Sequence, residues 1–295
     1  MRSMKNRRVN KKKEGERMIA DNSEKFPSFI YGTAWKRDAT AELVNTAVSS
    51  GFSGIDTANQ PRHYQEHLVG EALLKLASEG IDREELFIQS KFTPADGHDH
   101  RIPYDPSADL STQVKQSFEG SLKNLRTDYL DSYLLHGPYS QPGLGNEDWE
   151  VWSAIEDLYK SGKARFIGIS NVNIVQLQLL AKKARIKPMV VQNRCFASRG
   201  WDRAVRVFCR DNHIVYEGFS LLTANSFVLQ NPGVQKIARE LGRSPEQVVF
   251  RFSMQAGMIP LTGTRSEGHM KEDMLVRDFK LDSNDLNLIE NLTCI

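Results

Sequence analysis

This chain of 295 residues has only three cysteines, no long apolar run and no large excess of one charge sign. No segment approaches the roughly 18 consecutive apolar residues that cross a bilayer, which excludes a membrane-spanning protein. The basic N-terminus lacks the apolar stretch of a secretory signal. Three cysteines are too few for a disulfide framework or a closed zinc site, so we expect a soluble protein of a reducing compartment, the cytoplasm.

The small net charge of +2 conceals an uneven distribution. Residues 1–17 carry eight basic and two acidic side chains, whereas the 31 basic and 35 acidic side chains that remain give −4. We therefore predict a disordered basic tail over residues 1–25, to which we assign no function, although a weak contact with RNA or anionic lipid is an alternative. A mildly acidic body does not indicate a specific nucleic-acid partner.

From residue 26 onward, short apolar or β-branched runs alternate with longer runs of helical periodicity. The expected strands are Ser28–Ala34, Gly54–Ala58, Leu86–Phe92, Ser132–His136, Phe166–Asn171, Met189–Cys195, Ile214–Ser220 and Met258–Gly263. The expected helices include Thr40–Ser50, His67–Glu79, Thr112–Leu125, Asp148–Lys160, Ile174–Ala184, Trp201–Arg210, Pro245–Ala256 and Asn284–Leu292.

Eight strands joined by helices predict an α/β fold with a parallel sheet, and eight is the number that closes a (β/α)8 TIM barrel. The alternative, an open doubly wound sheet, requires a glycine-rich phosphate turn after its first strand, and Gly32-Thr33-Ala34 is not one. No linker interrupts the alternation, so we predict a single barrel domain over residues 26–295. Since such a barrel is self-contained, we expect a monomer.

Polar side chains at the carboxyl ends of the expected strands indicate the active site, because barrel enzymes place their chemistry there. Asp56, Lys91 and His136 end three neighbouring strands and are expected to converge. A carboxylate beside an ammonium keeps both charged, and the ammonium favours ionisation of a nearby phenol. A tyrosine is the group that such a pair would tune.

Several motifs, in order along nearly the whole chain after the tail, resemble the aldo-keto reductase signature. They are Gly54-Ile55-Asp56-Thr57-Ala58, Tyr64 with Val69-Gly70-Glu71-Ala72-Leu73, Ser90-Lys91, Asp128-Tyr129-Leu130-Asp131, Leu134-Leu135-His136, Gly168-Ile169-Ser170-Asn171, Gln192-Asn193 and Ile259-Pro260. The resemblance implies reduction of an aldehyde or ketone with hydride from C4 of a nicotinamide cofactor, without a metal ion.

The resemblance also implies roles for four residues. Tyr64 would protonate the carbonyl oxygen, Lys91 paired with Asp56 would lower the pKa of the tyrosine, and His136 would orient the carbonyl. The chain departs from the family in three respects. Tyr64 follows Asp56 by eight positions, three more than is common, and Pro61-Arg62-His63 resembles an insertion. Leucine stands at position 261, and Asp273 and His269 stand where an asparagine and an arginine are usual.

The cofactor contacts implied by the resemblance fall into three groups. Ser170, Asn171 and Gln192 would contact the carboxamide of the nicotinamide. Phe219, Ser220 and Leu222 belong to the segment that would stack on the nicotinamide ring and bind the pyrophosphate. The adenosine end would contact Thr262, Arg265, His269 and Asp273. Leu261 stands where a phosphate-binding lysine is frequent, and Arg265 would replace it, which favours NADPH while leaving NADH possible. Trp35 and Phe92 are expected to line the substrate pocket.

Other interpretations of these residues remain open. Ser170-Asn171 would also suit the cap of the following helix, and Phe219 would suit core packing. A nicotinamide-binding regulatory protein with little turnover is an alternative that would keep the cofactor contacts, and the altered spacing before Tyr64 is the feature that supports it. A barrel lyase or isomerase using Lys91 as a Schiff-base amine is a third, weaker alternative. The physiological carbonyl substrate is not evident from the sequence.

Overall fold

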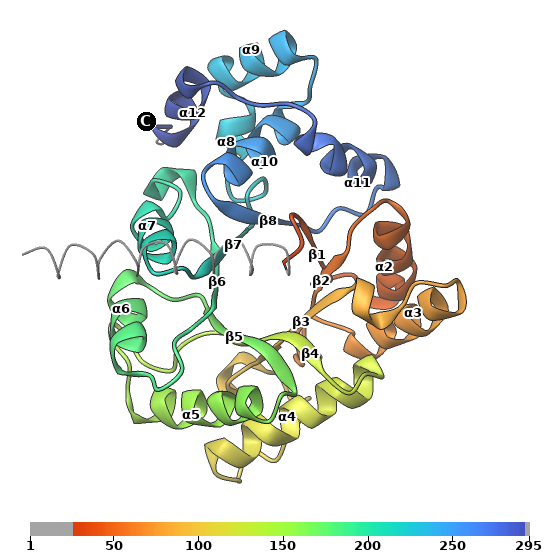
Figure 1. Ribbon diagram of the computed structural model, residues 1–295, viewed down its shortest axis with the longest axis vertical. Helices are drawn as coiled ribbons and strands as arrows, with labels where there is room; N and C mark the ends of the chain where they lie inside the picture. The colour runs from red at the N-terminus through yellow and green to blue at the C-terminus, as the bar shows by residue number, and fades with distance from the viewer. Residues whose placement is uncertain (1–25, 293–295) are drawn as a thin grey trace, which may run out of the picture.

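Eight parallel strands form a closed ring in the computed structural model, which describes residues 26–292 (Figure 1). The predicted tail over residues 1–25, and residues 293–295, lie outside the described residues. The ring closes because β8 pairs with β1, where Ile30 lies opposite Leu261. The strands are β1 Ile30–Gly32, β2 Gly54–Asp56, β3 Phe87–Phe92, β4 Leu130–Leu135, β5 Ala164–Ser170, β6 Val190–Arg194, β7 Val215–Phe219 and β8 Met258–Thr262.

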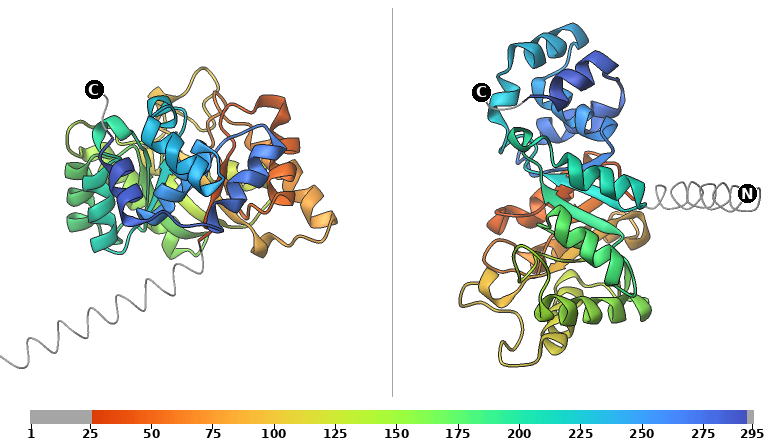
Figure 2. Two further views of the ribbon diagram at one scale, coloured as in Figure 1. Left: turned by 90° about the horizontal axis from the view of Figure 1, so that it is seen from above. Right: turned by 90° about the vertical axis from the view of Figure 1, so that its left-hand side faces the viewer.

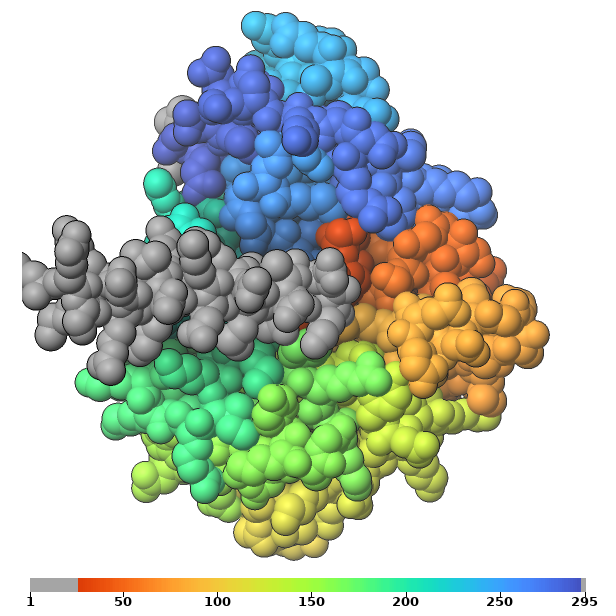
Figure 3. Space-filling model, in the orientation of Figure 1, coloured from red at the N-terminus to blue at the C-terminus, as the bar shows by residue number. Residues whose placement is uncertain are grey.

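Helices surround the strands, and the outer surface follows the chain order around the ring (Figures 2 and 3). They are α2 Thr40–Ser49, α3 Glu66–Ser78, α4 Leu110–Leu125, α5 Asn146–Lys160, α6 Ile174–Lys183, α7 Arg203–Asp211, α8 Ser226–Leu229, α9 Pro232–Leu241, α10 Pro245–Gln255, α11 Glu267–Met274 and α12 Ser283–Glu290. Short 3-10 turns are η1 Arg37–Ala39, η2 Arg83–Glu85, η3 Ala95–Gly97, η4 Ala197–Arg199 and η5 Leu275–Arg277. The predicted (β/α)8 barrel is confirmed. No helix within the described range is long and apolar enough to span a membrane.

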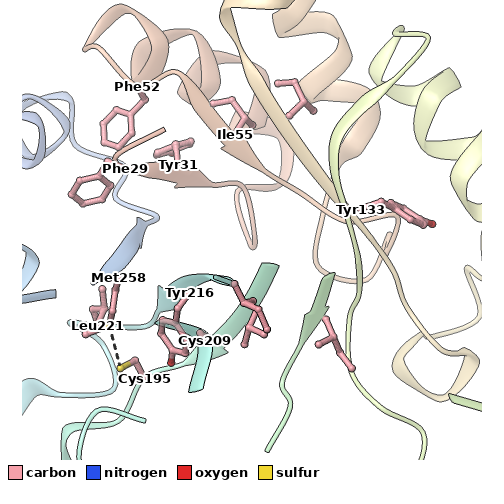
Figure 4. Close-up of a cluster of buried hydrophobic side chains, with 14 of the residues drawn as sticks. Phe29, Tyr31, Phe52, Ile55, Tyr133, Cys195, Cys209, Tyr216, Leu221 and Met258 are labelled. Atoms are coloured by element: carbon pink, nitrogen blue, oxygen red, sulfur yellow. Dashed lines mark hydrogen bonds between the residues drawn. The ribbon is translucent and has the colours of Figure 1, made fainter. Parts of the chain in front are cut away.

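The apolar core fills the space between strands and helices. Alternate strand residues point outward, and Phe29, Tyr31 and Phe52 meet edge to face on the β1 side of the barrel (Figure 4). The Cys195 thiol, just after β6, contacts the sulfur of Met258 at the start of β8, at 3.8 Å. Aliphatic and aromatic residues thus fill the layer between the strands and the helices. Polar side chains can therefore occupy the inside of the ring near the carboxyl ends of the strands.

The segment between β7 and β8 contains more helix than the sequence analysis expected. It predicted one helix there, and the structure has three, α8, α9 and α10. Signals for α9 are present, since Asn231 caps it, Pro232 occupies its first turn and Gly242 ends it with a φ of 60°. At α10 the expected cap is found, with Ser244 accepting from the backbone N–H of Gln247.

Three loop residues at the carboxyl ends of strands have left-handed backbone conformations. The φ angles are 62° at Trp35, 54° at Asn171 and 56° at Ser220. A left-handed residue turns the chain out of the sheet, so Asn171 and Ser220 lie just beyond β5 and β7 and not within them as predicted. The first strand is likewise shorter than expected, with three residues.

Candidate active site

A buried ion pair lies at the carboxyl ends of β2 and β3. The Nζ of Lys91 lies 2.6 and 2.7 Å from the two carboxylate oxygens of Asp56 and also donates to the carbonyl of Thr57 at 2.8 Å. Lys91 is completely buried and Asp56 is 3% exposed. Burial, the largest effect, lowers the pKa of Lys91, but Asp56 together with Tyr64 and Glu217 more than offsets it, so the net pKa is raised and the ammonium stays charged.

Two glutamines and a second carboxyl group surround this pair inside the barrel. The amide nitrogens of Gln89 and Gln192 each donate to both Asp56 and Glu217, at 2.7–3.0 Å. Burial raises the pKa of Glu217 to about 7. Sequence analysis missed Gln89 and Glu217, because they become neighbours only when β3 and β7 face each other across the ring.

Tyr64 reaches the ion pair despite the insertion that precedes it. The Lys91 Nζ lies 5.5 Å from the centre of its ring, and the ring of His136 lies 6.0 Å away, edge to face. The inserted residues form a turn held by Gln60, whose carbonyl accepts from the backbone of Tyr64 at 3.0 Å and whose side chain binds His63. The extra residues are thus accommodated in the loop, and the tyrosine remains beside Lys91.

The net pKa shift of Tyr64 differs in sign from the expectation. Burial raises the pKa of the phenol, the charge of Lys91 lowers it as expected, and Asp56 adds a smaller increase. The effect of burial is the largest of the three, so the net pKa of Tyr64 is raised. The phenol is therefore held in its protonated form, the form that can donate a proton.

His136 follows β4 directly and lies between Tyr64 and the loop after β3. Its Nδ1 lies 2.7 Å from the hydroxyl oxygen of Thr93, and its backbone N–H donates to the carbonyl of Phe92. Burial, with a smaller contribution from the charge of Lys91, lowers the pKa of His136 well below its usual value. The imidazole is consequently neutral at physiological pH.

The three predicted carboxamide contacts are linked to each other and to the ion pair. Asn171 donates to the Ser170 hydroxyl at 3.1 Å and to the His136 carbonyl at 2.8 Å, and Ser170 donates to the backbone carbonyl of Gln192 at 2.7 Å. Helix α6 is capped by Asn173. The alternative that Ser170-Asn171 caps this helix is therefore wrong, and these polar groups lie at the barrel mouth.

The predicted stacking and pyrophosphate residues follow in β7 and its loop. Phe219 ends β7 and is half-buried, and Ser220 and Leu222 are also partly exposed. The guanidinium of Arg194, its register partner on β6, lies 5.4 Å from the ring centre of Phe219. Since Phe219 is not sealed in the core, its ring is available to a flat ligand.

Cations gather beside the loop after β8. A hollow of about 430 Å³ is lined by three cationic residues and one acidic residue, Lys36, Arg37, Arg265 and Asp38, together with Trp35 and Ala39. Arg265 donates to the backbone carbonyls of Trp35 and Lys36, at 2.8 and 3.2 Å, and the Lys36 ammonium donates to the carbonyl of Gly263. Burial and the charge of Arg265 lower the pKa of Lys36 to about 8. A bound anion would relieve this repulsion, so the hollow suits a phosphate. Lys36 was not singled out from the sequence.

The remaining residues predicted to contact the adenosine end differ in accessibility. Thr262 is buried at the end of β8, His269 is exposed on α11 and lies 3.5 Å from the Thr264 hydroxyl, and Asp273 is 5% exposed on α11. Burial raises the pKa of Asp273 to about 7, and Thr262 opposes this shift. The carboxyl group at position 273 thus titrates near neutrality.

This titration predicts a pH-dependent stability difference. The pKa is near 4 in the unfolded chain and about 7 in the folded one, so the stabilisation is complete below pH 4 and is lost as pH rises through 7. We expect Asp273→Asn to match wild type at pH 3.5 and to exceed it by on the order of 2 kcal/mol at pH 8.5. Urea unfolding at both values measures this. Equal stabilities of wild type and Asp273→Asn at pH 8.5 would contradict the prediction.

The two residues predicted to line the substrate pocket have different positions. Trp35 is 59% exposed, and its ring stacks on that of His63, 4.1 Å between centres. Phe92 is completely buried and packs against Tyr104, so it is a core residue and not a pocket wall as predicted. A second hollow, of about 1040 Å³, is lined in part by Phe26, Phe87 and Phe166 near the opposite ends of the strands and contains none of the predicted site residues.

In the described residues, no three His, Cys, Asp or Glu side chains come together as metal ligands. His63 binds Gln60 and stacks on Trp35, while His98 donates its Nε2 proton to the carbonyl of Thr93. His63 and His98 thus each have a hydrogen-bonding role of their own.

Comparison with known proteins agrees with this geometry. The sequence model of the aldo/keto reductase family matches residues 29–293. Glyoxal reductase of Bacillus subtilis is 34% identical over 85% of this chain and 82% of its own, and NADPH-dependent codeinone reductase 1-4 of Papaver somniferum is 32% identical over 94% and 87%. The crystal structure of MGS-M4, an aldo-keto reductase from a deep-sea metagenome library, superposes with a TM-score of 0.77 at 26% identity, over 92% and 94% of the two chains.

The chain belongs to the aldo-keto reductase family. Its activity is the nicotinamide-dependent reduction of an aldehyde or ketone to the alcohol. Membership of this family of oxidoreductases sets aside the regulatory and Schiff-base alternatives.

Proposed function

We propose that Tyr64 is the general acid, that Lys91 and Asp56 set its electrostatic environment, and that His136 orients the carbonyl. The observation that carries this assignment is the convergence of the Tyr64 ring, the Lys91–Asp56 pair and the His136 ring at the ends of adjacent strands. A reduced nicotinamide supplies the hydride when bound.

The residues present fit such a cofactor. Side-chain amides and a hydroxyl for a carboxamide lie next to the ion pair, and a hollow with three cationic residues lies beside the loop after β8. As the carbonyl carbon gains hydride, negative charge develops on its oxygen. The Tyr64 hydroxyl then transfers its proton to that oxygen, and the nearby Lys91 ammonium stabilises the phenolate that remains.

NADPH is the proposed cofactor, on the strength of Lys36, Arg37 and Arg265 around the hollow. Guanidinium binds phosphate in a fixed fork geometry, which favours the cofactor that carries the additional phosphate. The codeinone reductase relative is itself described as NADPH-dependent.

The activity assay is loss of NADPH absorbance in the presence of a reactive aromatic aldehyde. We expect steady turnover by the wild-type protein, with appearance of the alcohol in equal amount. A protein that binds NADPH by fluorescence titration yet consumes none with a panel of aldehydes and ketones would contradict the proposal and favour a sensing role.

Removal of Arg265 should change cofactor selectivity. We expect Arg265→Ala to raise the Kd of NADPH about 30-fold and to leave the Kd of NADH nearly unchanged, because a charged hydrogen bond contributes roughly 2 kcal/mol. Fluorescence titration measures both constants. Arg239 on the outer helix α9 provides the control, since Arg239→Ala removes an arginine remote from the hollow. A parallel loss of NADPH and NADH affinity would place the phosphate elsewhere.

The cellular setting proposed for this enzyme is the cytoplasm, as a monomer acting on a small carbonyl compound without a specific nucleic-acid partner. Cys195 and Cys209 are free and buried, which supports a reducing compartment. The barrel closes on itself through β1 and β8, which supports the monomer and the single domain over residues 26–295.

A further inference from the structure

Thr93 occupies a defined place between the ion-paired strand and His136. It follows Phe92 at the end of β3 and precedes Pro94, and a residue before proline prefers an extended backbone. Its carbonyl accepts from the Tyr104 hydroxyl at 2.8 Å and from His98 at 3.1 Å. These contacts fix the backbone of a residue that is only 3% exposed.

The hydrogen bond between Thr93 and His136 has a direction that can be worked out. Within residues 26–292 the Thr93 hydroxyl has one partner, the Nδ1 of His136 at 2.7 Å. If Nδ1 carried the proton, the hydroxyl would accept it and its own hydrogen would remain buried without an acceptor, which is costly. If the hydroxyl donates, both groups are satisfied.

The other ring nitrogen of His136, Nε2, is not sealed in the protein interior. Among the described residues Nε2 of His136 has no hydrogen-bond partner, and it is not one of the fully buried polar atoms that lack a partner. The His136 and Tyr64 rings lie 6.0 Å apart in an edge-to-face arrangement. A neutral imidazole whose Nδ1 accepts a hydrogen bond carries its one proton on Nε2, the nitrogen available to a substrate oxygen.

We propose that Thr93 is a positioning residue that fixes the Nε2–H tautomer and the ring orientation of His136 by donating its hydroxyl proton to Nδ1. The inference rests on the proposed function in one respect, the placement of the substrate carbonyl beside His136. Thr93 itself does not contact the reacting atoms. Its effect on catalysis passes through the histidine.

Thr93→Val tests the hydrogen bond, because valine keeps the branched shape and removes only the hydroxyl. We expect kcat/KM for an aromatic aldehyde to fall about tenfold, with the Kd of NADPH unchanged, since loss of a hydrogen bond of this size has that effect on a rate. Thr93→Ser keeps the hydroxyl and should restore most of the activity. Equal losses in the Val and Ser variants would assign Thr93 a packing role and overturn the proposal.

The tautomer can be read directly and independently of turnover. Two-bond 1H–15N correlation spectra of protein labelled with 15N-histidine report the protonation of each ring nitrogen. The signals of His136 are assigned as those that disappear from the spectrum of the His136→Gln variant. We expect a protonated Nε2 and an unprotonated, hydrogen-bonded Nδ1 in wild type and Thr93→Ser, and a shift of the Nδ1 resonance toward that of a free imine nitrogen in Thr93→Val. A protonated Nδ1 in wild type would overturn the proposal. An inactive wild type with the expected tautomer would instead point to failure of the proposed function.

Discussion

Tyr64→Phe is expected to lower kcat for aldehyde reduction about 1000-fold while leaving the Kd of NADPH within a factor of two. The substitution removes only the proton donor, and general acid catalysis contributes between about 10² and 10⁴ in rate. Lys91, Asp56 and His136 keep their mutual contacts, because none of their recorded hydrogen bonds involves the Tyr64 hydroxyl. NADPH consumption and fluorescence titration measure the two quantities.

Tyr129→Phe is the matched control for this experiment. Tyr129 precedes β4, and its hydroxyl is buried without a hydrogen-bond partner in the described part of the chain, so its loss should leave kcat unchanged. Full turnover by Tyr64→Phe would assign the acid to another residue. A decrease of the same size in Tyr129→Phe would show that tyrosine substitutions act through folding.

Lys91→Met is expected to abolish measurable turnover and to lower the free energy of unfolding by about 3 kcal/mol. Methionine fills the volume of the lysine stem, but Asp56 is left as a buried carboxylate without its cation. The amides of Gln89 and Gln192 still donate to that carboxylate, which places the expected loss at the lower end of the range for a broken buried pair. Urea unfolding at pH 7 measures the change.

The double variant Asp56→Leu/Lys91→Met separates stability from catalysis. Replacing both charges with apolar side chains removes the uncompensated carboxylate, so we expect the double variant to recover more than half of the stability lost in Lys91→Met. Turnover should remain absent, because the cation beside Tyr64 is still missing. Recovery of activity with stability would show that Lys91 acts only as a structural partner of Asp56.

Much of the barrel was predictable from local patterns, as two kinds of element illustrate. β3 and β4 each contain several aromatic and aliphatic residues and lie between well-separated turns, so their positions are correct within two residues. The short strand β1 was overestimated, because Ala34 and Trp35 continue the apolar run although Trp35 turns into the left-handed region. Helix α8, with four residues, is too short to show a period.

The site divides in a similar way. Asp56, Lys91 and His136 were accessible to sequence analysis, because each ends a strand, and strand ends share one face of the barrel. Lys36 and Thr93 were not, since their importance arises from contacts with Gly263 and His136 on elements distant in sequence. The pKa shift of Tyr64 was not predictable for the same reason, because its direction depends on burial, which only the folded chain defines.

The left-handed residues at the barrel mouth restrict which amino acids can replace them. At Asn171 and Ser220, with φ angles of 54° and 56°, valine, isoleucine and threonine would carry a steric cost unrelated to any ligand, whereas glycine and aspartate would carry little. A saturation library selected only for folding would therefore already be depleted of β-branched residues at both positions. Intolerance there has two separable sources, backbone geometry and cofactor contact, and glycine variants distinguish them because they satisfy the first while removing the second.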